Sequence, residues 1–201
     1  EEYSLAEVLV AEAVDFTGGH PAVLLRTTSL AALCIAFRDA KDRDAALSTL
    51  ADRAHRRVAD GSSPPWVAGE MFGVEGARDD DGITRLRLPV SQRPSLSRRC
   101  DLRRGLSVKK AAGWLHVTDA LLLFVPHEGP PSGGLAILKA DVARVQLKDG
   151  SGWEEVEGAS VCVDSMASSG RSSAARVSFS GLARDDAERV VRALLPQLPA
   201  R

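Results

Sequence analysis

The stretch GWLHVTDALLLFVPHEGPPSGGLAILKADVARVQL, residues 113–147, decides the fold of this chain. Short apolar segments alternate in it with residues typical of turns, first Thr118-Asp119 and then the Gly/Pro-rich HEGPPSGG. The longest apolar run, residues 120–125, is far too short to span a bilayer. The stretch therefore predicts a series of short β-strands joined by turns.

The chain after this stretch continues the pattern and then changes period. The segments ASVCVD and ARVSFSG predict two more strands on either side of a Ser/Gly-rich loop. In RDDAERVVRALLPQL the apolar residues recur at helical spacing, and Pro196 ends the helix. The helical face consists of Ala187, Val190, Val191, Leu194 and Leu195. Residues 106–201 therefore predict a set of strands closed by one amphipathic helix.

The first sixty residues have a similar order. Residues 4–15, AVLLRTTS and LCIAF predict strands because they are rich in apolar and β-branched residues. From Asp39 to Asp60-Gly61 the apolar positions follow a helical period, with Asp39 as the N-cap. In both halves a strand containing a late Phe, Phe37 or Phe179, leads into a charged helix start. This internal repeat predicts two related units.

The repeat divides the chain into three parts. Residues 1–60 form the C-terminal half of a first unit, residues 61–105 form a linker or insertion with a basic segment, and residues 106–201 form a complete second unit. The opening strands of the first unit are expected upstream of Glu1, as in a fragment of a longer protein, or are supplied by residues 66–90. Residues 83–90, ITRLRLPV, alternate in the manner of a strand.

This order of strands and a closing helix resembles the pleckstrin-homology (PH) superfold, in particular its GRAM and PH-like branch. A narrower resemblance, to the tandem-PH middle domain of the FACT small subunit and related histone chaperones, rests on one set of positions. These are Ser107, Lys109, Gly113, Leu115, Phe124, Val125 and Pro130-Pro131. The resemblance implies an α+β, mainly β fold of two PH-like barrels or sandwiches, each closed by a C-terminal amphipathic helix. It also implies a binding platform for a partner.

Composition bounds the setting of the protein. The 201 residues carry a formal net charge of −1, so no global field draws the chain to nucleic acid or membrane. The three cysteines are far apart and lack metal-ligand spacing, which argues against both a disulfide framework and a zinc site. The N-terminus lacks the order of a signal peptide. We expect an intracellular, reducing compartment, with nucleus and cytoplasm both open.

The charge is unevenly distributed. Between Arg85 and Lys110 lie nine basic residues and one acid, Asp101. Such a segment suits phosphates of lipid or nucleic acid, or an acidic protein surface, although a solvated loop that balances residues 79–81 is the plainer alternative. Trp153 lies in the turn-like GSGWEEVEG, where an interface aromatic is expected. The candidate binding residues are Arg98, Arg99, Arg103, Arg104, Lys109, Lys110 and Trp153.

Catalytic signals are missing from the sequence. No nucleophile elbow, phosphate-binding loop, dinucleotide fingerprint or carboxylate pair is present, so we expect no enzyme, no cofactor and no small-molecule substrate. His116 and His127 lack a third ligand at a helpful spacing, and no metal is expected. Cys100 has two readings, a reactive thiol of lowered pKa or an exposed thiol without function. Trp114 is expected in the core.

Two functions follow from this sequence. The first is a non-catalytic protein-interaction module of a larger assembly, with histone or chromatin binding through tandem PH-like units as its most specific version. The alternative is a GRAM-type membrane adaptor that binds anionic phosphoinositide lipids through the basic segment. The oligomeric state is left open.

Overall fold

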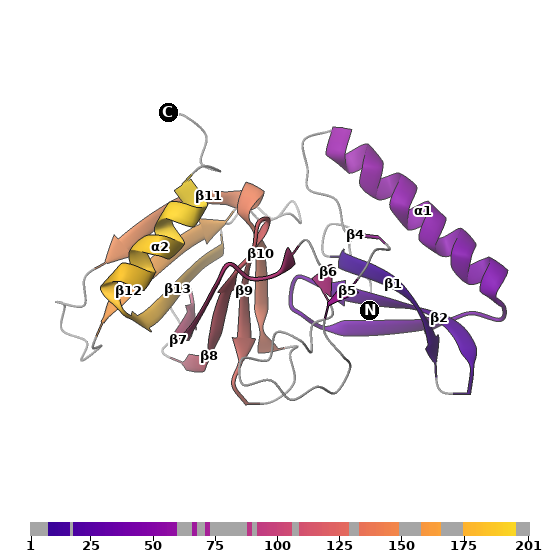
Figure 1. Ribbon diagram of the computed structural model, residues 1–201, viewed down its shortest axis with the longest axis horizontal. Helices are drawn as coiled ribbons and strands as arrows, with labels where there is room; N and C mark the ends of the chain where they lie inside the picture. Colours follow the sequence, from indigo (N-terminus) through magenta and orange to yellow (C-terminus); the bar gives the residue numbers. More distant parts are fainter. Residues whose placement is uncertain are drawn as a thin grey trace.

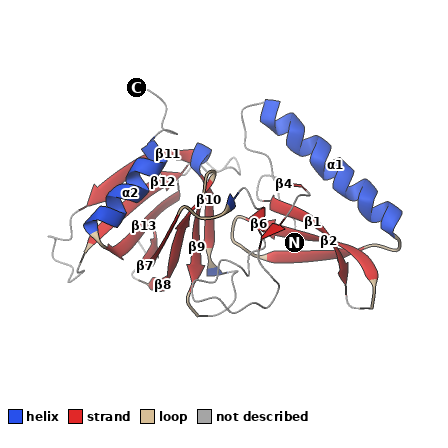
Figure 2. Cartoon of the chain, viewed as in Figure 1, coloured by secondary structure: helices blue, strands red, loops and turns tan. Residues whose placement is uncertain are grey.

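The computed structural model describes residues 8–16, 18–59, 66–67, 71–72, 88–89, 92–105, 109–128, 133–148, 158–165 and 175–195. These residues form a curled sheet covered by a short helix, and beside it a smaller sheet covered by a long helix (Figure 1). Among the described residues, more lie in strands than in helices; Figure 2 draws the strands in red and the helices in blue. The expected α+β, mainly β class is therefore confirmed.

The larger sheet has seven strands in the order β10-β9-β8-β7-β13-β12-β11. Strands β7 to β10 form one antiparallel series, and β11 to β13 form another. The first strand of this unit, β7, pairs antiparallel with the last, β13, and so joins the two series. Helix α2, Arg184–Leu194, lies across one side of the curled sheet (Figure 1). The strands are β7 Leu96–Arg104, β8 Lys110–Val117, β9 Leu121–Pro126, β10 Leu135–Leu138, β11 Val142–Lys148, β12 Ala159–Ser165 and β13 Ala175–Leu182.

The main core lies between the curled sheet and α2. Phe124 and Phe179 are almost fully buried there, with ring centroids 6.4 Å apart. Helix α2 contributes its predicted apolar face, since Ala187, Val190 and Leu194 are each 0% exposed. Burial of a valine, leucine or phenylalanine side chain stabilises the fold by about 1.5–3 kcal/mol. Seven strands closed by one amphipathic helix are the architecture expected of a PH-like unit.

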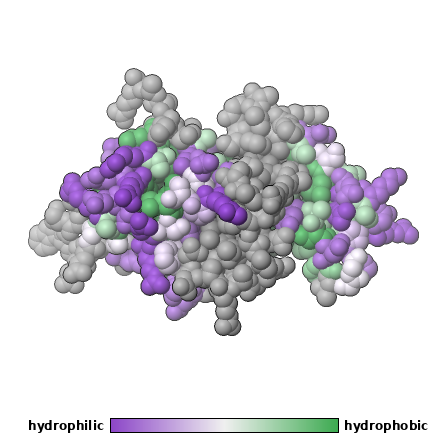
Figure 3. Space-filling view, in the orientation of Figure 1, coloured by the Kyte–Doolittle hydropathy of each residue, from purple (hydrophilic) through white to green (hydrophobic). Residues whose placement is uncertain are grey.

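The smaller sheet has the order β3-β2-β1-β4. Helix α1, Ala40–Ala59, packs on it through Leu47 and Leu50, and apolar side chains gather where the two meet (Figure 3). The backbone amide of Asp42 donates to the Asp39 carboxylate at 2.9 Å, which confirms the predicted N-cap. The strands are β1 Val8–Phe16, β2 His20–Thr27, β3 Ala32–Ala36 and β4 Trp66–Val67. A separate two-residue ladder joins β5 Met71–Phe72 to β6 Leu88–Pro89.

The two sheets pack against each other through a second apolar cluster. Leu9, Val10 and Leu30 of the smaller sheet and its turn contact the outer face of β9 and β10. The contacted side chains are Leu121, Leu123, Val125 and Ala136. The Ala136 amide also donates to the Thr28 carbonyl oxygen at 2.7 Å. Strand β9 is therefore covered on both faces, which explains its unbroken apolar sequence.

Most strands and both helices lie where the sequence predicts them. Strand β7 is the main addition, because it occupies residues that the sequence places in the linker with its basic segment. Of the predicted strand 83–90, residues 88–89 form β6 and the rest lie outside the described residues. Each half contains an antiparallel three-strand meander followed by a helix, β1-β2-β3-α1 and β11-β12-β13-α2. The tandem PH-like arrangement itself stays a prediction.

Candidate binding site

Strand β7 carries four of the predicted binding residues: Arg98, Arg99, Arg103 and Arg104. Lys109 precedes β8, Lys110 is its first residue, and both side chains are exposed. Trp153 lies outside the described residues. The structure thus brings six predicted positions onto one hairpin, β7–β8.

Side-chain alternation divides the four arginines of β7 into two pairs. Cys100 and Leu102 are buried in the main core, so residues of the same parity, Arg98 and Arg104, lie on the core side of the strand. Arg99 and Arg103 lie on the outer face. The two pairs therefore have different surroundings, although they share one segment of sequence.

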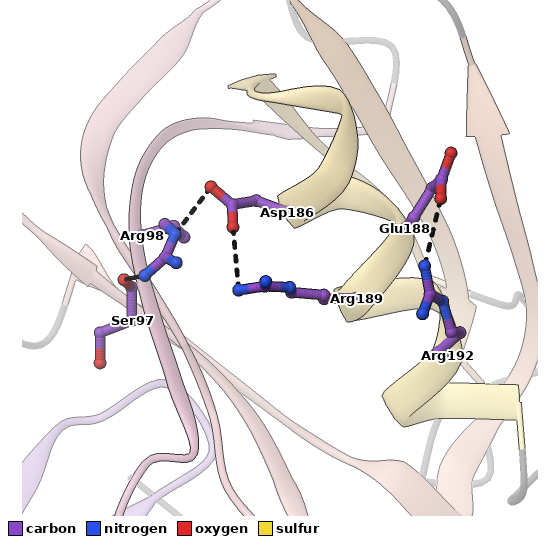
Figure 4. Close-up of polar contacts among 6 residues, drawn as sticks. All are labelled: Ser97, Arg98, Asp186, Glu188, Arg189 and Arg192. Atoms are coloured by element: carbon purple, nitrogen blue, oxygen red, sulfur yellow. Dashed lines mark hydrogen bonds and ion pairs between the residues drawn. The ribbon is translucent and has the colours of Figure 1, made fainter.

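Arg98 links β7 to the beginning of α2. Its Nε lies 2.7 Å from Asp186 Oδ2, and its Nη1 donates to the Ser97 carbonyl oxygen at 2.8 Å (Figure 4). The two paired side chains are 39% and 18% exposed. Asp186 lies in the first turn of the helix, where a carboxylate is also favoured by the helix dipole. Arg98 therefore supports the fold and is a poor candidate for a ligand contact.

Arg104 has a similar internal role at the other end of β7. Its Nη2 donates to the carbonyl oxygens of Gly133 at 3.0 Å and Gly134 at 2.7 Å. These glycines directly precede β10. Arg104 therefore links β7 to the residues that lead into β10.

On the outer face, Arg99 lies directly opposite Trp114. The guanidinium carbon of Arg99 is 5.1 Å from the indole centroid, a cation–π geometry. The indole ring stacks on His116 with centroids 6.5 Å apart, and the His116 Nδ1 is 2.9 Å from the Ser97 hydroxyl. The expectation of Trp114 in the core was wrong, because Leu115 and Val117 occupy the core side of β8.

A cavity of about 370 Å³ opens beside Trp114. It contains a cation and an anion on adjacent positions of one strand face, Arg99 and Asp101, together with the buried Ser180 of β13. The indole Nε1 of Trp114 is buried and has no hydrogen-bond partner among the residues that the structure describes. The lining residues are Arg99, Cys100, Asp101, Ala112, Gly113, Trp114, His127, Ser180 and Gly181. We call this the Trp114 cavity.

Gly113 allows β8 and β9 to approach closely beside the cavity. A Cβ at this position would collide with the Val125 carbonyl oxygen and would lie 2.6 Å from Phe124 Cζ. Phe124 belongs to the main core, so it has no room to withdraw. The absence of a side chain at Gly113 is therefore a requirement of the strand packing.

Cys100 lines the Trp114 cavity, but its thiol resists ionisation. The residue is 6% exposed, and burial, with a smaller contribution from the charge of Asp101, raises the pKa of the thiol to about 12. The thiol therefore stays protonated at neutral pH. Both readings from the sequence, a lowered pKa and an exposed thiol, were wrong because the residue faces the core.

The remaining cations lie at the end of the hairpin. Arg103 is directly opposite Lys110, so two positive charges face each other across β7 and β8. Directly opposed like charges destabilise a strand pair unless an anion lies between them. This end of the hairpin is therefore the more basic part of the surface.

The sequence did not identify the Trp114 cavity. Its members come from β7, β8, β13 and the residues after β9, so no local motif marks it. The alternation of Arg99 and Asp101 was the available signal, and it was masked by the surrounding arginines. Within the described residues, no cluster of His, Cys, Asp and Glu is suited to a metal ion. None of the described helices is both long enough and apolar enough to cross a membrane.

Comparison with known proteins gives structural similarity alone. No protein-family model matches the chain, and a search of curated proteins finds none similar to it. The Vps36 N-terminal PH domain is 16% identical, covers 54% of this chain and 83% of its own, and has a TM-score of 0.41. The C-terminal domain of an unknown protein from Leishmania infantum is 15% identical, covers 52% and 85%, and has a TM-score of 0.39. The fold of the larger unit is therefore described by its own topology, a seven-stranded curled sheet with α2 across it.

Proposed function

We propose that this protein is a non-catalytic binding module whose PH-like unit captures a segment of a protein partner at the Trp114 cavity. The observation that carries the proposal is the Arg99 guanidinium stacked over the Trp114 indole in the wall of the cavity. Trp and Arg in a partly enclosed pocket are the residues that most often dominate binding energy at protein interfaces.

The charge of the cavity favours a peptide over a phosphate group. Asp101 would repel a multiply charged phosphate, whereas a polypeptide can offer a cation to Asp101 and an acceptor to Arg99. The most specific version of the proposal is a histone partner, whose basic tails supply lysine and arginine for Asp101. Such a partner also suits the resemblance to tandem-PH histone chaperones.

Anionic phosphoinositide lipid is the second candidate ligand. The opposed Arg103 and Lys110, with Lys109 beside them, favour it. Arg98 and Arg104 are engaged within the fold, and Arg103 and Lys109 also make interactions within the chain, so the basic surface open to a headgroup is smaller than the sequence implies. This candidate therefore ranks below the protein partner.

The test is binding of the purified chain to core histones at moderate salt, measured by calorimetry. Arg99→Ala and Trp114→Phe, which replaces the indole with a smaller aromatic ring, should each weaken binding about five- to tenfold, as expected for loss of about 1 kcal/mol. Lys148→Ala, an exposed cation on β11 outside the cavity, should leave affinity unchanged.

Two results would redirect the proposal. Absence of histone binding removes the chromatin version, and histone binding that neither cavity variant weakens moves the site elsewhere. Vesicles with and without phosphoinositides provide the comparison with lipid. Vesicle binding that Lys109→Glu and Lys110→Glu abolish, with no effect of the cavity variants, would favour the second candidate.

A further inference from the structure

Strand β3 has one open edge. It pairs with β2 on one side, and none of the strands in the described part of the chain pairs with the other side. Residues 66–67 form β4 at the opposite edge, beside β1, and β5 and β6 pair only with each other. The described part of 66–90 therefore does not complete the sheet at β3.

The exposed edge lacks the usual protection against pairing. β3 reads Ala-Leu-Cys-Ile-Ala, without charge or proline, and Ile35 is 47% exposed. Protein sheets normally guard such edges with lysine, proline or a bulge. An apolar, uncharged edge strand is therefore suited to accept a further strand.

The other half of the chain shows such a strand in place. β13 holds the position of β3 in its own meander, directly before the helix, and its outer edge pairs with β7. Four β13 residues, Val177 to Ser180, pair antiparallel with residues 104 to 101. None of the described strands occupies the same position in the smaller sheet.

The direction of the backbone groups on β3 follows from two hydrogen bonds. The Ala31 carbonyl accepts from the Thr27 amide at 3.0 Å, and the Phe37 amide donates to the Pro21 carbonyl at 2.8 Å. Residues of odd number therefore turn their backbone groups toward β2. By alternation, Ala32, Cys34 and Ala36 direct their amides and carbonyls outward.

We propose that β3 pairs with β3 of a second copy of this chain, antiparallel and centred on Cys34. The strand reads almost the same in both directions, so Cys34 faces Cys34 and Ala32 faces Ala36 of the other copy. These are the residues whose backbone groups point outward, so every outward amide meets a carbonyl. A twofold axis relates the copies, as in most homodimers.

The side chains also fit this register. Ile35 lies opposite Leu33 of the second copy, on the face that α1 covers, and gains apolar cover there. The five residues of β3 carry no charge, so no like charges meet across the paired strands.

Cys34 gives a direct readout of the register. It is exposed, whereas Cys100 and Cys162 are buried. Directly opposed residues of a hydrogen-bonded antiparallel pair have Cα atoms about 5.5 Å apart, within the range of a disulfide or a short bismaleimide. The intact chain should therefore form a covalent dimer through Cys34 on mild oxidation or cross-linking.

The experiment combines cross-linking with sedimentation over a range of concentrations. Wild-type chain should show a concentration-dependent dimer, and Cys34→Ser should keep the dimer but lose the cross-link. Ile35→Lys should raise the dimer dissociation constant at least tenfold. Leu195→Lys is the matched control, because Leu195 is 48% exposed on the far unit, and it should have no effect.

Three results would overturn the proposal. They are a monomer at every concentration, a dimer that Ile35→Lys leaves intact, and a dimer in which Cys34 does not cross-link. Circular dichroism of each variant shows whether the fold is retained.

Discussion

Gly113 is a residue whose identity the packing of the site requires. Its missing side chain lets β8 lie against the Val125 carbonyl and the Phe124 ring, beside the Trp114 cavity. The sequence shows a glycine at this position but does not show which atoms require it.

Replacing Gly113 by alanine should destabilise the protein strongly. The added methyl group meets backbone on one side and a buried ring on the other, so we expect a loss of about 3 kcal/mol in the free energy of unfolding, measured by urea denaturation. Gly133→Ala is the control, since its Cβ would meet only Pro126 Cγ at 3.4 Å, and it should cost under about 0.5 kcal/mol. Equal losses in the two variants would contradict this account.

Trp114 shows where residue-scale prediction failed. The segment GWLHV is apolar on both faces, so periodicity could not decide which face meets the main core. Leu115 and Val117 took that side, and Trp114 and His116 took the outer face. The position of Trp114 on the outer face is explained by its cross-strand pairing with Arg99, which the sequence does not show.

At the scale of the element, β7 was missed because its charges concealed its alternation. Leu96, Cys100 and Leu102 alternate as a strand requires, but Arg98 and Arg104 interrupt the inward-facing row. Both arginines satisfy their charge with partners distant in sequence, Asp186 and the Gly133-Gly134 carbonyls. By contrast, the helix that follows Asp39 was predictable, because its cap and its apolar face are local features.

The ion pair between Arg98 and Asp186 should be stronger than the exposed pair between Arg192 and Glu188 on α2. A double-mutant cycle with Arg98→Ala and Asp186→Ala should give a coupling energy of about 1 kcal/mol, since the pair is partly buried and 2.7 Å long. The control is the exposed pair Arg192–Glu188, at 3.2 Å, for which we expect about 0.3 kcal/mol.

The measurement is the free energy of unfolding of each single and double variant. Histone affinity of Arg98→Ala should equal that of the wild type, because Arg98 faces away from the Trp114 cavity. If Arg98→Ala lowered histone affinity without lowering the free energy of unfolding, Arg98 would belong to the binding site.

At the scale of the whole molecule, the two sheets form one folded body through the cluster around β9. The repeat, the strands and the closing helix were visible in the sequence, because each depends on local period and turn residues. The contact between the sheets was not visible. It depends on which strand lies behind which, and an unbroken apolar run such as residues 121–125 is compatible with any fully buried strand.

Leu123→Ala should destabilise both sheets together. Leu123 is 0% exposed and lies between them, so we expect a single unfolding transition with a loss of about 3 kcal/mol. Leu138→Ala, at the partly buried margin of the same cluster, should cost less than half of that. The measurement is urea unfolding followed by near-ultraviolet and far-ultraviolet dichroism. Two separate transitions, of which only one moves, would show that the sheets unfold independently.

The burial of β9 on both faces affects how readily the unfolded chain aggregates. Because both faces of β9 are covered, no position from Leu121 to Val125 can carry a charged residue. Proteins commonly use such residues to prevent aggregation of an apolar strand. A short, uncharged segment of high β-propensity is the kind that assembles into intermolecular cross-β structure when it is exposed. Docking of the smaller sheet on β9 therefore keeps an uncharged, apolar strand away from solvent in the folded protein.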